Sequence, residues 1–116
     1  MVAHSPNHLV EDLNSRFASA EASFHRAYWD SQVEATPATD RIRAERELEV
    51  RRVKGDREAY DAVSAALAEE IHDPLVKRQL EVLSRSLTAN QMDESDRTSI
   101  VDLSTAIEGT FAAFRP

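Results

Sequence analysis

Histidines and carboxylates are the residues of this chain that could bind a metal or transfer a proton, since the sequence has no cysteine. A His-Glu-x-x-His motif would place two imidazoles and a general base on one helix face, and this zinc signature is absent. His4 and His8 are four residues apart, but Pro6 lies between them close to the start of the chain. We therefore expect no metal site there.

Glu69 and His72 form the one Glu-x-x-His spacing in the sequence. Di-iron bundles use this spacing to present a carboxylate and an imidazole to one metal, but they need two copies and two further glutamates. His72 also directly precedes Asp73-Pro74, where a histidine suits the negative end of the preceding helix. We favour the capping interpretation, expect no cofactor in this chain, and keep Glu69 and His72 as the metal candidates to test.

The remaining residues do not form a recognisable catalytic motif. No serine lies in a Gly-x-Ser-x-Gly or Ser-x-x-Lys sequence, and the two glycines, Gly55 and Gly109, cannot build a phosphate-binding loop. Most carboxylates fall on faces that we expect to be solvated. The residues alone do not predict an enzyme, and no catalytic residue is assigned.

The charge of the chain excludes some partners. It has 116 residues, with 21 acidic against 14 basic side chains and a net charge of -7, so a phosphate backbone would be repelled and no nucleic-acid partner is expected. No apolar run approaches the roughly 20 residues that span a bilayer, so no membrane partner is expected. Residues 1–8 lack the features of a signal peptide. We expect one cytoplasmic domain, residues 1–116, with residues 1–7 disordered.

Few glycines and prolines, together with abundant alanine, glutamate, arginine and leucine, predict an all-α fold. Cap signals divide the chain at Thr36-Pro37, Gly55-Asp56, Asp73-Pro74 and residues 90–93. At Gly55 we expect the left-handed backbone that ends many helices. The resulting segments predict an antiparallel bundle of about five helices, the first running from about Pro6 to Glu34 and the second from about Pro37 to Lys54.

Apolar residues recur every three or four positions in these segments and predict the faces that form the core. The predicted stripes are Leu9, Leu13, Phe17, Ala20, Phe24 and Tyr28; Ile42, Leu48 and Val53; Tyr60, Val63, Leu67 and Ile71; Val76, Leu80, Leu83 and Leu87; and Ile100, Leu103, Ile107, Phe111 and Phe114. The stripe in residues 37–54 is thin and predicts an outer helix. Leu75, Val82, Val101 and Ala112–Ala113 lie off the stripes, so the last two helices are either central in the bundle or meet a partner.

Tyr28 and Trp29 have two interpretations. Both could pack in or at the edge of the core, or one could cover the surface of a partner or substrate, since such residues suit surfaces that are apolar on one side and wet on the other.

Several short motifs then occur in a characteristic order. These are Ala27-Tyr28-Trp29, Asp73-Pro74-Leu75, Arg78-Gln79-Leu80-Glu81-Val82-Leu83, Asn90-Gln91, Thr110-Phe111 and Phe114-Arg115. From about Phe17 to Arg115 the chain resembles the N-terminal helical region of zinc-dependent oligopeptidases of the angiotensin-converting-enzyme and thimet/oligoendopeptidase F type. It departs from that pattern at Ser84, Ser86 and Ala89, where a more aromatic, proline-containing approach to Asn-Gln is expected.

The resemblance implies a helical lid that walls one side of a deep channel and admits short, unstructured peptides. It implies that Tyr28, Trp29, Asn90 and Gln91 face a partner or substrate. Zinc and a catalytic glutamate are implied only for a parent peptidase and would belong to its catalytic domain.

The expected function is that of a non-catalytic helical domain, a truncated or split piece that packs on a catalytic peptidase domain. The alternatives are a stand-alone protein-interaction or dimerisation module, with a homodimer as the partner, and a metal-binding helical bundle.

Overall fold

A computed structural model describes residues 5–114 of the chain, and these residues form five helices without a strand. The helices are α1 (Pro6–Val33), α2 (Pro37–Lys54), α3 (Arg57–Leu67), α4 (Pro74–Ala89) and α5 (Glu94–Ala113). The all-α prediction is confirmed. Of the segment expected to be disordered, residues 1–4 with His4 lie outside the described residues, whereas Ser5 caps α1 and residues 6–7 belong to its first turn.

The predicted cap residues set the starts of the helices. Thr36 and Thr39 form a capping box at the start of α2, where each hydroxyl accepts a hydrogen bond from the backbone N–H of the other, at 3.1 and 3.0 Å. Asp73 accepts the backbone N–H of Leu75 at 2.9 Å and begins α4. Asp93 occupies the cap position of α5 without a side-chain hydrogen bond to that helix.

Two predictions about helix ends are wrong. The helix after Asp56 ends at Leu67 rather than extending to Ile71, which lies in the connecting segment and still packs against the core. Gly55 has φ of −97° and does not adopt the left-handed conformation. Its small size is required instead, because an added Cβ would lie 2.6 Å from the backbone oxygen of Asn90 and 2.9 Å from that of Arg51.

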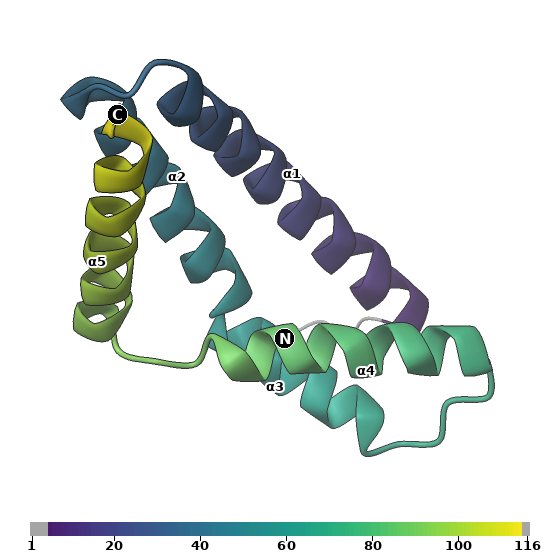
Figure 1. The fold of residues 1–116 in the computed structure, drawn as a ribbon. Helices are drawn as coiled ribbons and strands as arrows, with labels where there is room; N and C mark the ends of the chain where they lie inside the picture. The colour runs from purple at the N-terminus through teal and green to yellow at the C-terminus, as the bar shows by residue number, and fades with distance from the viewer. Residues whose placement is uncertain (1–4, 115–116) are drawn as a thin grey trace.

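The molecule is elongated, with dimensions of 57 × 25 × 23 Å, and its apolar core lies at one end. There the N-terminal half of α1 packs with α3 and α4 (Figure 1). The buried core residues are Leu9, Val10, Leu13, Phe17, Ala59, Val63, Val76, Leu80, Leu83 and Leu87. The predicted stripes of α1 in its first half, α3 and α4 supply most of them, as the three-to-four periodicity requires.

At the other end, α2 lies between α1 and α5 (Figure 1). The buried residues of α2 are Arg43 and Glu47 rather than an apolar stripe, and Ile42 is largely exposed. The predicted core face of α5 is also wrong. Its buried residues are Arg97, Val101 and Ala112, none of which belongs to the predicted stripe.

Candidate functional site

The inner face of α5 is held to α2 by polar contacts around one buried guanidinium. Arg43 of α2 donates hydrogen bonds to Thr105 at 2.8 Å and to Ser104 at 3.3 Å on α5, and to Glu47 at 3.2 Å on its own helix. The carboxylate of Glu47 also accepts a hydrogen bond from Arg51 at 3.4 Å, the favourable spacing of four within a helix. This network joins the two helices through charge and hydroxyl groups.

Aromatic rings of α1 cover the same guanidinium. The central carbon of the Arg43 guanidinium lies 5.5 Å from the ring centre of Tyr28 and 5.9 Å from that of Phe24, within the range of cation–π attraction. The hydroxyl of Tyr28 donates a weak hydrogen bond to Glu108 of α5 at 3.4 Å. Arg43 therefore connects all three helices at this end of the molecule.

This cluster determines which side of α5 faces inward. A buried arginine left without hydrogen-bond acceptors costs several kcal/mol, which is comparable to what burying two or three aliphatic side chains returns. The face with Ser104 and Thr105 supplies those acceptors, whereas the apolar face cannot. Arg43 thus draws the small and polar side of α5 against α2 and leaves its apolar side outward.

Four apolar residues line that outward side, and we call them the outer stripe: Ile100, Leu103, Ile107 and Phe111. Their exposed fractions are 37, 65, 69 and 77 %. At about 200 Å² for a large side chain, the outer stripe offers roughly 500 Å² of apolar surface. Contiguous patches of this size on a monomer are often functional. Phe114, at the C-cap of the helix, is also exposed.

The exposed charged residues of α5 are all acidic. Its described residues include the exposed carboxylates of Glu94, Asp96 and Asp102. The one basic residue, Arg97, is buried and donates to Glu94 at 2.6 Å. Hydrogen bonds from Arg52 and then Arg97 hold the pKa of Glu94 below its ordinary value of 4.5. Helices that lie on anionic membranes carry Lys and Arg on the polar face, and the exposed surface of α5 has neither.

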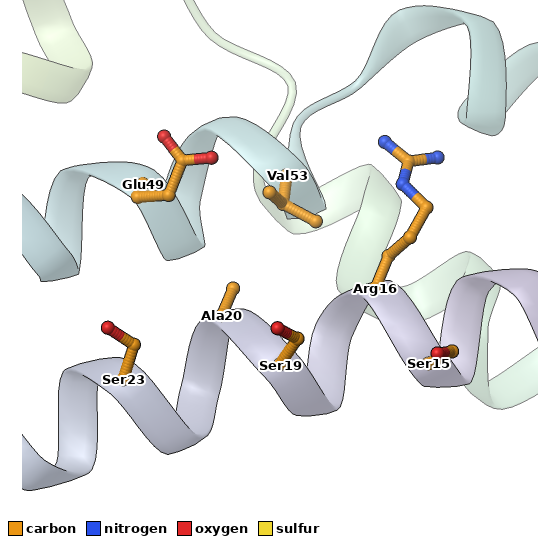
Figure 2. A pocket seen from close by; sticks show the side chains of 7 residues that line it. All are labelled: Ser15, Arg16, Ser19, Ala20, Ser23, Glu49 and Val53. Atoms are coloured by element: carbon orange, nitrogen blue, oxygen red, sulfur yellow. The ribbon is translucent and has the colours of Figure 1, made fainter.

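A shallow groove of about 450 Å³ separates α1 from α2 (Figure 2). Its lining residues are Ser15, Arg16, Ser19, Ala20, Ser23, Glu49 and Val53. The guanidinium of Arg16 bonds Asp56 at 3.1 Å, outside the set that lines the groove. None of the lining residues is a histidine or cysteine that could activate a serine, so the groove lacks the parts of a nucleophilic site.

The structure separates the four residues expected to face a partner or substrate into two pairs. Tyr28 is half-buried against Arg43, while the neighbouring Trp29 is 68 % exposed. Asn90 is the C-cap of α4, where its amide donates to the backbone of Ser86 at 2.7 Å, and Gln91 follows it in the loop. The backbone oxygen of Asn90 accepts from Arg97 at the start of α5, and Tyr28 contacts the other half of that helix.

The metal candidates lie in the segment between α3 and α4 and not on a helix. His72 is highly exposed, with its Nδ1 3.9 Å from a carboxylate oxygen of Glu70 rather than Glu69. In residues 5–114 no group of three or more histidine, cysteine or acidic side chains is arranged to hold a metal ion. Nor does any helix in this part of the chain have the length and apolarity to cross a bilayer.

Comparison with family models, with curated proteins and with solved structures finds no match to this chain. The candidate functional residues are therefore assigned from the structure of this chain alone. Sequence reasoning missed the buried pair Arg43 and Glu47, whose spacing of four on one helix face was the available signal. It also placed the outer stripe in the core.

Proposed function

We propose that this chain is a helical protein-interaction module and that the outer stripe of α5 is its contact surface. The observation that carries this proposal is the orientation of α5, which turns a continuous apolar stripe to solvent while Arg97, Val101 and Ala112 are buried. Because exposing such a stripe opposes the hydrophobic effect, it is typical of a surface that another protein covers.

The acidic surroundings of the outer stripe support a protein as the partner. With its one described basic side chain paired and buried, α5 has no exposed cation to attract a nucleic acid or an anionic lipid surface.

The second candidate is a lid that packs on a peptidase catalytic domain. Supporting it, Trp29 and Phe111, two aromatic residues that carry the resemblance to oligopeptidase lids, are 68 and 77 % exposed. On this proposal the same face of α5 would meet a catalytic domain that brings its own zinc, and the chain would show no peptidase activity alone.

Photo-crosslinking inside the cell tests the proposed contact surface. A photoreactive phenylalanine analogue at Leu103 or Phe111 should yield a discrete adduct on irradiation. The matched control positions are Leu75 and Val82 of α4, which are also exposed and apolar but lie outside the outer stripe. We expect no adduct from the controls.

The mass and sequence of the adduct identify the partner. A crosslinked protein with a His-Glu-x-x-His motif would favour the lid over the other candidates. If neither α5 position yields an adduct, or if the α4 positions yield the same one, the outer stripe is not a contact surface and the proposal fails.

A further inference from the structure

We infer that the outer stripe binds the same stripe of a second copy of this chain, with the two α5 helices antiparallel and Ile107 at the two-fold axis. This inference rests on the proposed function, because it names the partner of the surface assigned there.

The spacing of the outer stripe suits such a two-fold contact. Leu103 lies four residues before Ile107 and Phe111 lies four residues after it. When an identical helix packs in the opposite direction, Ile107 meets its own copy, and each Leu103 lies opposite a Phe111 of the second copy. A self-complementary contact of this kind closes after two copies and leaves no open end for further association. Two leucine–phenylalanine pairs then flank the central pair of isoleucines along the seam, which favours interdigitation.

The buried area meets the requirement for a specific dimer. The outer stripe supplies roughly 500 Å² per chain, so two copies bury about 1,000 Å² before flanking residues are included. Specific protein interfaces begin at about this size.

Analytical ultracentrifugation of the purified full chain tests this inference with a matched pair of variants. Leu103 and Leu75 are both leucines with 65 % of their surface exposed, one in the outer stripe and the other on α4. The wild type should sediment as a dimer of 13.0 kDa chains. Leu103→Lys should weaken self-association by about 100-fold or more, while Leu75→Lys leaves it unchanged. Circular dichroism should show that both variants keep the helical content of the wild type.

Charge variants at the axis test the pairing itself. Ile107→Lys and Ile107→Glu should each be monomeric, since like charges would meet at the two-fold, and an equimolar mixture should form a heterodimer. The absence of cysteine allows a second test. Ile107→Cys should oxidise to a disulfide-linked dimer, which requires a close approach of the two Cα atoms, whereas Leu75→Cys should not.

Several outcomes would overturn the inference. A wild type that remains monomeric up to about 100 μM, or equal weakening by the two leucine variants, rejects the second copy as partner. A failure of the Ile107→Lys and Ile107→Glu mixture to associate rejects the register. The crosslinking experiment keeps the two proposals separate. An adduct at Phe111 with a different protein retains the interaction module and rejects the dimer, whereas no adduct rejects both.

Discussion

Two truncations to alanine should separate the true core from the exposed stripe. Leu80 on α4 is fully buried among the residues of α1, α3 and α4, while Ile107 on α5 is 69 % exposed. Leu80→Ala removes buried methyl groups and leaves a cavity, so it should lower the free energy of unfolding by about 2–5 kcal/mol. That is a large part of the roughly 5–15 kcal/mol that holds a domain of this size together.

Ile107→Ala should behave differently in the monomer. The side chain already lies in water and alanine is the better helix former, so the free energy of unfolding should change by less than about 0.5 kcal/mol. Urea denaturation followed by circular dichroism measures both variants, at protein concentrations low enough for the chain to be monomeric. Repeating the Ile107→Ala measurement at higher concentration adds the loss of self-association, which appears as a concentration-dependent difference from wild type.

The result that would refute this reasoning is a reversal of the two values. A loss above about 2 kcal/mol for Ile107→Ala at low concentration would mean that α5 buries its apolar side in the monomer. A loss below about 0.5 kcal/mol for Leu80→Ala would mean that the core is not where the structure places it.

Three further predictions concern the polar contacts and the glycines. Arg43→Ala should lower the free energy of unfolding by about 3–5 kcal/mol, because it leaves Glu47 buried without its main partner, and Arg43→Met with Glu47→Leu should recover much of that loss in chemical denaturation. Arg52 and Arg97 lower the pKa of Glu94 in the folded state. Glu94 therefore stabilises the fold at pH values above 4.5, its unfolded pKa, and this contribution disappears as the pH falls through the lowered folded pKa. Glu94→Gln should therefore be less stable than wild type at pH 7 and equal to it in strong acid; a constant difference across an acid titration of stability would contradict this. Gly109→Ala should raise the melting temperature, because only a flexible carboxylate of α2 must move and the helix gains about 0.5–1 kcal/mol. Gly55→Ala should lower the melting temperature, because the added Cβ would meet backbone oxygens. Equal shifts in the melting temperatures of the two variants would contradict this prediction.

The parts of the fold that could be predicted from sequence are those where local chemistry decides the outcome. Hydroxyl or carboxylate groups followed by proline locate the starts of α2 and α4, because a free backbone N–H is satisfied within the same turn. In α3 and α4 the apolar periodicity also identifies the buried face, since each helix meets an equally apolar neighbour.

The face of α5 could not be predicted in this way. Periodicity shows that Leu103 and Ile107 share a side of the helix, but it does not show what that side meets. The neighbouring helix α2 presents a buried Arg43, whose hydrogen-bond acceptors on α5 are Ser104 and Thr105, outside the stripe that contains Leu103 and Ile107. For the same reason, the outer stripe can be identified as a candidate contact surface only from the packing of α5 against α2.

The way α5 is attached has a consequence for how the chain opens. The apolar core at the far end does not include α5. The buried side chains of α5 are Arg97, Val101 and Ala112, and the Nε atoms of Arg43 and Arg97 are buried without an acceptor in the described part of the chain. We therefore expect α5 to detach at a lower free-energy cost than α3 and α4, and its amide protons should exchange with solvent before theirs. An occupied outer stripe would close this local opening by mass action, so the abundance of the partner would regulate how much of the chain is fully ordered.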